Sequence, residues 1–276
     1  MTSRILGIAR EKIFSPGREG DDLEILTQTA NHLIARGYQV DILDPEELER
    51  KPNDGVLVVF SMAQGRETLE VLKKWEKRGC LVLNSPQAVL NCYRAAMVNL
   101  FRESSLPFPK TATLTLQDHI VLPEKFEIER GVWVKRGDVH ATERDDVVWI
   151  SEKEKLSILL KSYRQRGISV ALIQEDLKGD VVKFYALRGE GLLEWRYTEA
   201  PGTYPFHVKD LERLAEEAAT LLGLDVYGGD MIVTKEGTLY LIDINDWPSF
   251  SSCRELASEK IAQLILKRMG DKKNDA

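Results

Sequence analysis

Several features that define common protein classes are scarce or missing in this chain of 276 residues. Its three cysteines, Cys80, Cys92 and Cys253, are odd in number and lack metal-like spacing, so neither a disulfide framework nor a zinc site is expected. Its four histidines belong to no convincing Ser-His-Asp or Cys-His set. No apolar run is long enough to span a bilayer, so we expect no membrane partner and a reducing cytoplasm as the compartment.

The overall charge is also modest. A net charge of −6 argues against nucleic acid as the main partner, because nucleic-acid-binding proteins usually carry a surplus of positive charge. The composition, 43% hydrophobic and 30% charged, is typical of a globular protein. A chain of this length can bury a substantial core and hold two or three subdomains.

Strand-like and helix-like segments alternate over the first 85 residues. This alternation predicts a parallel α/β sheet. Loops at the carboxyl ends of such strands commonly bind ligands, so residues 10–18 and 61–66 are candidate substrate loops. An exposed edge of this sheet would permit a homodimer. The expected strands are 5–9, 38–43, 55–60 and 81–83, and the expected helices are 21–36 and 67–78.

The remaining chain has more strands and fewer helices. A helix is expected from Pro86 to about residue 104, and a Pro-x-Pro sequence at Pro107 then breaks the chain. Three subdomains follow from this reading, at 1–85, 86–173 and 174–270, with a disordered tail at 271–276. The later strands are expected at 131–135, 147–150, 170–174, 181–188, 192–197, 229–234 and 239–245, and the later helices at 152–166, 209–222 and 255–269.

Asp243 and Asn245 lie two residues apart on an apolar strand, so both side chains leave the same face of the sheet. Burying a carboxylate and an amide together is costly unless something compensates their oxygens. Mg²⁺ accepts carboxylates, neutral oxygens and substrate phosphates. This pair therefore predicts a metal–nucleotide site; the alternative is that Asn245 only makes a turn.

Asp230 lies on the preceding strand, which leads into a glycine-containing turn. If Glu236 and Gly237 form a two-residue loop, Asp230 pairs with Asp243 on the same face. A three-residue loop would shift the pairing by one residue and place Asp230 on the other face. The sequence alone leaves both registers open.

Lys135 and Lys183 each interrupt an apolar, strand-like run. A half-buried lysine needs an anion or a carboxylate nearby, so the two could hold the phosphates of one nucleotide from either side. Local carboxylates or solvent are the alternative partners. Between them, the apolar strand 171–174 runs into an acidic hinge at Glu175 and Asp176, whose backbone could pair with adenine and whose carboxylates could take ribose hydroxyls.

The order of these parts resembles the ATP-grasp superfamily over about residues 84–266. The resemblance implies an α/β (α+β) ATP-grasp fold: an N-terminal parallel α/β subdomain followed by two β-rich subdomains that clasp ATP. It also implies that the cofactors are ATP and two Mg²⁺ ions. Asp230, Asp243 and Asn245 match the magnesium ligands. The nucleotide-binding residues implied by the resemblance are Lys135, Lys183, Arg94, Arg136, His140, Gln174, Glu175, Asp176 and Leu177.

Three of these residues lie where the chain departs from the family pattern. The phosphate-covering loop is often rich in glycine, whereas residues 136–142 contain one, with Arg136 and His140 adding charge. Arg94 stands where the family often has lysine, and a bidentate arginine would suit a phosphate or a carboxylate.

Two branches of the family look closest. One contains carboxylate–amine ligases resembling glutathione synthetase and the ribosomal-protein S6 modification ligase, and the other contains inositol polyphosphate kinases. The resemblance to the first implies a ligase that joins a small-molecule carboxylate to an amine through an acyl phosphate. In that reaction Lys183, Arg196 and Arg254 are the candidate catalytic residues. The alternatives are a kinase acting on a polyol or sugar phosphate and a non-catalytic ATP sensor.

Overall fold

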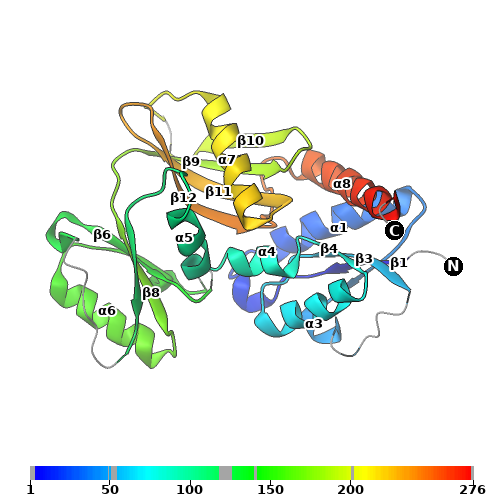
Figure 1. The fold of residues 1–276 in the computed structure, drawn as a ribbon, viewed down its shortest axis with the longest axis horizontal. Helices are drawn as coiled ribbons and strands as arrows, with labels where there is room; N and C mark the ends of the chain where they lie inside the picture. Colours follow the sequence, from blue (N-terminus) through cyan, green and yellow to red (C-terminus); the bar gives the residue numbers. More distant parts are fainter. Residues whose placement is uncertain are drawn as a thin grey trace.

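The chain folds into three four-stranded sheets, each with its own helices (Figure 1). This computed structural model describes residues 4–48, 50, 55–117, 126–139, 142–199 and 202–274. In Figure 1 the first sheet lies on the right, the second on the left and the third between and above them. None of the helices in these ranges is long and apolar enough to cross a membrane.

The first sheet is parallel, with strand order β2-β1-β3-β4, as the alternating pattern predicted. Helix α3 shows how the sequence directs this packing: its buried residues Leu69, Leu72 and Trp75 recur every three positions, and Thr68 beside Leu69 is buried too. The first sheet and its helices comprise β1 (Arg4–Ile8), the 3-10 helix η1 (Lys12–Phe14), α1 (Glu19–Ala35), β2 (Gln39–Leu43), α2 (Pro45–Leu48), β3 (Val56–Ser61), α3 (Arg66–Lys77) and β4 (Leu81–Leu83).

The second sheet is antiparallel, with order β5-β8-β6-β7. Helix α6 covers it with Leu156, Leu160 and Tyr163, and the cluster they join is a core separate from the others. This part comprises α4 (Pro86–Asn91), α5 (Arg94–Arg102), β5 (Thr111–Thr115), η2 (Ile128–Arg130), β6 (Val132–Arg136), η3 (Arg144–Asp146), β7 (Val147–Ile150), α6 (Lys153–Gln165) and β8 (Val170–Glu175).

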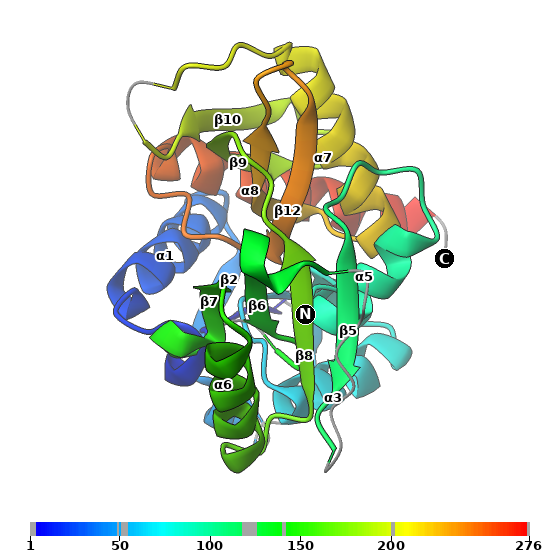
Figure 2. The same ribbon diagram turned by 90° about the vertical axis from the view of Figure 1, so that its left-hand side faces the viewer.

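The third sheet is also antiparallel, with order β10-β9-β11-β12. Helix α7 covers one face, where Leu211, Leu214 and Ala218 join a core with Phe184 and Met231 of the sheet. The opposite face is therefore left for other contacts, and Figure 2 shows the second sheet below it. This part comprises β9 (Asp180–Leu187), β10 (Leu192–Tyr197), α7 (Val208–Leu222), β11 (Val226–Val233), β12 (Leu239–Asp246) and α8 (Arg254–Asn274).

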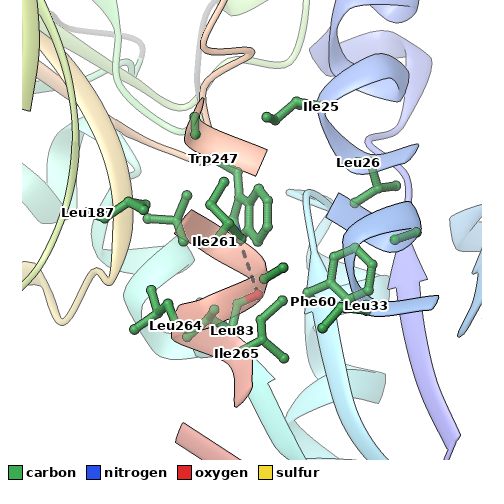
Figure 3. Close-up of a cluster of buried hydrophobic side chains, with 14 of the residues drawn as sticks. Ile25, Leu26, Leu33, Phe60, Leu83, Leu187, Trp247, Ile261, Leu264 and Ile265 are labelled. Atoms are coloured by element: carbon green, nitrogen blue, oxygen red, sulfur yellow. Dashed lines mark hydrogen bonds between the residues drawn. The ribbon is translucent and has the colours of Figure 1, made fainter. Parts of the chain in front are cut away.

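The first and third sheets share one hydrophobic core (Figure 3). Trp247, which follows β12, is fully buried beside Phe60 of β3, with ring centroids 6.2 Å apart. The Trp247 indole N–H donates to the Leu83 carbonyl of β4 at 3.2 Å. Helix α8 then continues into the same core and packs against α1. The loop after β12 is thus anchored against the first sheet.

The helix expected from Pro86 to about residue 104 is two helices. Helix α4 ends at Asn91 and α5 begins at Arg94, because Tyr93 between them has an extended backbone (φ −62°, ψ 127°). Tyr93 uses this break to donate its hydroxyl to the carbonyl of Gln64. The break turns Arg94 inward, where it is 5% exposed.

Two other elements differ from expectation. Strand β5 was not expected after the Pro-x-Pro break, and it forms because its backbone pairs with β8. Helix α8 extends to Asn274 and so includes residues 271–274, which were expected to be disordered. Residues 275–276 lie outside the described residues.

Candidate active site

A row of charged residues crosses the open face of the third sheet. Asp243 of β12 lies opposite Asp230 of β11. Asp230 lies opposite Lys183 of β9, and Lys183 lies opposite Arg196 of β10. Directly paired residues in a sheet share a face. Two acids and two bases, each from a different strand, therefore stand side by side on this face. The row brings together two of the three predicted metal ligands, Asp230 and Asp243, with the predicted cations Lys183 and Arg196.

Of the two registers left open by the sequence, the structure has the one that pairs Asp230 with Asp243, although the two-residue loop on which that register depended is wrong. Thr234 N–H donates to the Thr238 carbonyl at 2.9 Å, so three residues form the loop. That loop shifts the pairing near the turn by one residue. A β-bulge that leaves Ile242 unpaired then restores the register at Asp243.

Asp230, Asp243 and Asn245 provide the oxygens that a hard cation prefers. Burial raises the pKa of Asp230, Lys183 opposes this rise, and the neighbouring Asp243 carboxylate adds to it. Protein cations meet both carboxylates: Lys183 lies 3.2 Å from Asp230, and Arg94 lies 3.5 Å from Asp243. Two carboxylates and an amide leave the other positions of an octahedral Mg²⁺ to phosphate oxygens and water, so these residues fit the ion.

A cavity of about 250 Å³ lies between the second and third sheets. Its apolar walls come from both sheets and would suit a flat aromatic base. Four charged residues of the lining lie close together, because Asp243 pairs with Arg94, lies opposite Asp230 and acts on the charge of Lys135. The apolar lining includes Pro109, Trp133, Val147, Leu177, Val181, Ile232 and Ile242, and the polar lining is Arg94, Lys135, Gln174, Glu175, Asp230 and Asp243.

Lys135 is a buried cation of this first cavity, with 8% of its surface exposed. Its ammonium donates to the carbonyl of the bulged residue Ile242 at 3.4 Å. Burial lowers the pKa of Lys135 to about 8, which Asp243 opposes and Arg94 reinforces. An additional anion in the cavity would stabilise the charged form.

Three of the four predicted linker residues, Gln174, Glu175 and Leu177, line the first cavity. The Gln174 amide donates to Thr111 Oγ1 at 3.0 Å, which fixes its side chain. Asp176 does not line the cavity. Its two oxygens accept the indole N–H groups of Trp133 at 3.1 Å and Trp149 at 3.0 Å, so it holds the hinge rather than facing a ribose.

The predicted phosphate-covering loop begins at Arg136, whose side chain is paired with nearby carboxylates. Arg136 pairs with Asp138 at 2.6 Å and with Asp146 at 3.5 Å, and it does not line either cavity of the site. Its carbonyl accepts from Arg94 at 3.4 Å. His140 lies outside the described residues.

A second cavity, of about 420 Å³, adjoins the first, because Arg94 and Asp243 line both. Lys183 and Asn245 line its inner end. The two loops predicted to bind substrate contribute to it, as does the segment after β12. The loop residues that line it are Arg10, Phe14, Ser15, Pro16, Arg18 and Gln64, and the later ones are Asp246, Pro248 and Ser249.

The two arginines predicted to be catalytic stand outside the lining of both cavities. Arg196 is exposed, and its guanidinium makes no hydrogen bond or ion pair with a described residue. Arg254 pairs with Asp21 at 2.6 Å and donates to the Ser249 carbonyl at 3.3 Å. Arg254 therefore holds the loop that lines the second cavity.

No protein-family model matches this chain. It is 23% identical over 284 residues to a protein of Haemophilus influenzae described as a probable alpha-L-glutamate ligase, covering 87% of this chain and 90% of that protein. A D-alanine–D-alanine ligase from Bacillus anthracis, complexed with ATP, superposes with a TM-score of 0.74 at 14% identity, over 100% of both chains.

A structure of the ATP-grasp ligase PsnB with a precursor variant, Mg and ADP also superposes. Its TM-score is 0.63 at 18% identity, over 96% of this chain and 98% of that one. The chain has the ATP-grasp fold. The expected fold class, with its parallel sheet followed by two antiparallel sheets, is confirmed.

The sequence did not predict most of the apolar residues that line the first cavity. Trp133, Val147 and Val181 are apolar residues on strands that also supply core residues, so the sequence does not separate core positions from cavity positions. Gln64 was included only as part of a candidate loop. Its contact with Asp246 depends on the fold, which brings the loop after β3 beside the end of β12.

Proposed function

We propose that this protein is a Mg-ATP-dependent ligase that joins a carboxylate to an amine through an acyl phosphate. One observation carries the proposal: two adjoining cavities meet at Arg94 and Asp243. The first has an apolar slot and a charged end, as a nucleotide requires. The second opens from that charged end, where the terminal phosphate of the nucleotide would lie. The fold shared with ligases supports the same reading.

In the first step, a carboxylate oxygen of the substrate attacks the γ-phosphorus of ATP. An oxygen–phosphorus bond forms, and the bond to the β-phosphate oxygen breaks, which releases ADP. Lys135, Lys183 and Arg94 neutralise the charge that the transferred phosphoryl group carries. Mg²⁺ held by Asp230, Asp243 and Asn245 would supply Lewis-acid stabilisation of the phosphate oxygens.

In the second step, the amine attacks the carbonyl carbon of the acyl phosphate. A carbon–nitrogen bond forms, the carbon–oxygen bond to phosphate breaks, and the nitrogen loses a proton. Arg196 extends the cation row beyond Lys183. Because Arg196 lines neither cavity, we assign it no contact with the reacting groups, and we assign Arg254 to positioning the loop at Ser249.

The nucleotide residues follow from the first cavity. Gln174, Glu175 and Leu177 surround the base, and Lys135 and Arg94 hold the phosphates. Arg136 acts through its carbonyl, which orients Arg94. Asp176 keeps the hinge in place through the two tryptophans.

The proposal is tested by incubating the protein with ATP, Mg²⁺ and mixed pools of amines and small carboxylates. ADP and phosphate together with a product that has lost one water relative to its two substrates would support the ligase. A product heavier by one phosphoryl group would identify a kinase instead. ATP that binds without turnover on any pool would contradict the ligase reading.

A further inference from the structure

Arg10 is a buried arginine at the second cavity. It follows β1 at the carboxyl end of the first sheet and lines the cavity, and its side chain is 9% exposed. Burying a guanidinium costs free energy unless a carboxylate pairs with it. Asp22 of α1 provides that pair, with its Oδ2 3.0 Å from Arg10 Nε. The charge of Arg10 is therefore balanced inside the protein.

The guanidinium of Arg10 is held in one orientation from two sides. On one side, Asp22 Oδ2 also accepts the Ser15 hydroxyl at 2.7 Å, which fixes the carboxylate that faces Nε. On the other side, Nη2 donates to the backbone carbonyl of Trp247, with the carbonyl of Asp246 at 3.5 Å. Both carbonyls lie where β12, the strand of the proposed metal site, ends. Arg10 therefore links the loop after β1 to the end of that strand.

The remaining guanidinium nitrogen, Nη1, is left for a ligand. It makes no hydrogen bond with a described residue. Of the two Arg10 nitrogens without a hydrogen bond, Nε is fully buried and Nη1 is not. Because Arg10 is part of the lining of the second cavity, Nη1 is an oriented and accessible donor there.

A single free donor has a consequence for a carboxylate ligand. A complete guanidinium fork binds both oxygens of a carboxylate at once. With Nε and Nη2 occupied, Arg10 can hold one oxygen and leave the other able to react. Lys183 and Arg94, at the inner end of the cavity, already pair with the carboxylates of the proposed metal site, and Arg18 is exposed. Arg10 is therefore the buried cation placed to orient a carboxylate.

We propose that Arg10 holds the reacting carboxylate in the second cavity, with Nη1 donating to one of its oxygens while the other attacks the γ-phosphorus. This inference rests on the ligase function proposed above. The held oxygen becomes the carbonyl oxygen of the acyl phosphate, and it gains negative charge when the amine attacks the carbonyl carbon. Arg10 therefore assists both steps. Asp22 and Ser15 are positioning residues, because they fix the guanidinium without contacting the substrate.

The test isolates the first step by supplying hydroxylamine in place of the amine substrate, since hydroxylamine traps an acyl phosphate as a hydroxamate. The protein receives ATP, Mg²⁺ and the pool of small carboxylates, and KM is measured for the acid that yields most hydroxamate. Arg10→Met removes the guanidinium but keeps an unbranched side chain. We expect this KM to rise about 10- to 100-fold, the range of one charged hydrogen bond, while KM for ATP stays unchanged.

Two further variants separate orientation of the substrate from support of the fold. Asp22→Asn keeps the size of the side chain but removes its charge, and we expect KM for the acid to rise about tenfold with KM for ATP unchanged. Arg4→Met is the matched control: Arg4 pairs with Asp41 at the other end of β1 and lines neither cavity, so both KM values should match the wild type. Calorimetry with a non-hydrolysable ATP analogue bound should give the same rises in Kd for the acid. Thermal melting confirms that each variant is folded.

Two results would overturn the inference alone. One is a folded Arg10→Met variant with an unchanged KM for the acid. The other is an equal rise in KM for the acid and for ATP, which would show that Arg10 only supports the end of β12. If the wild type forms hydroxamate from none of the carboxylates, the ligase function is contradicted, and this inference with it.

Discussion

Asp230 lies directly opposite Asp243 in the β11–β12 pair, although the residues nearer the turn are paired one position out of that register. The bulge at Ile242 accounts for both facts. It also turns the Ile242 carbonyl to Lys135 of the second sheet. One extra residue in a strand therefore places two carboxylates together and provides a contact for the lysine that faces them.

Replacing Asp243 with alanine should abolish Mg²⁺-dependent ATP turnover without unfolding the protein. The side chain lines both cavities and belongs to the proposed metal site. We expect a loss of more than about 100-fold, the scale of losing one metal or oxyanion contact. ADP release at increasing Mg²⁺ measures it. Glu236→Ala, at an exposed residue in the turn of the same hairpin, is the control and should match the wild type.

Replacing Lys183 with alanine should weaken nucleotide binding. The ammonium lies 3.2 Å from Asp230, so its loss also leaves that carboxylate without its cation. We expect Kd for ATP to rise about tenfold or more, the effect of one charged hydrogen bond. Isothermal calorimetry measures the change. An unaltered Kd in a folded variant would remove Lys183 from the phosphate site.

ATP affinity should fall as the pH rises above 8. Burial lowers the pKa of Lys135 to about 8, so the free protein loses this positive charge between pH 7 and pH 9. Binding of phosphate requires the charged form, and the affinity should drop about tenfold over that interval. Lys135→Arg stays charged and should abolish the decline. A wild type with pH-independent affinity would place Lys135 away from the phosphates.

Trp133 should report nucleotide binding by its fluorescence. Both Trp133 and Trp149 donate to Asp176, but Trp133 alone of the two lines the first cavity, where we propose that the nucleotide binds. ATP should therefore alter the emission of the wild type and of Trp149→Phe, and the change should be lost in Trp133→Phe. An equal response from both variants would contradict the assignment of this cavity.

Replacing Trp247 with alanine should destabilise the protein by about 3–5 kcal/mol, the usual cost of deleting a buried tryptophan. The ring is fully buried where the first and third sheets share a core. Urea unfolding measures the loss. Leu256→Ala, at a side chain that is 45% exposed, should cost far less.

The sequence predicted the parallel first sheet well, because its strands and helices alternate with clear periodicity. It also predicted that Asp230, Asp243 and Asn245 lie together on one sheet. The bulge at Ile242 could not be predicted from the sequence, since an unpaired residue in an apolar strand has no local signature. Strand β5 was missed for a related reason: its threonine-rich sequence becomes a strand only by pairing with distant β8.

The candidate site, like the fold, could be predicted only in part from the sequence. Residues with an unusual type for their setting, such as a lysine within an apolar strand, were found from sequence. Asp176 has the right type for a ribose contact, but Trp133 and Trp149 occupy both of its oxygens. Such competition between partners depends on tertiary packing, and the sequence does not encode it in any local pattern.

Because Thr111 and Gln174 are paired, the chain enters and leaves the second sheet at almost the same point. Paired Cα atoms in antiparallel strands are only about 5 Å apart. Topologically, this sheet is an insertion into a body that the first and third sheets complete on their own through Trp247 and α8. The inserted unit has its own core, so it could be excised behind a short linker or exchanged for a related one, which would make the second sheet a replaceable part of the protein.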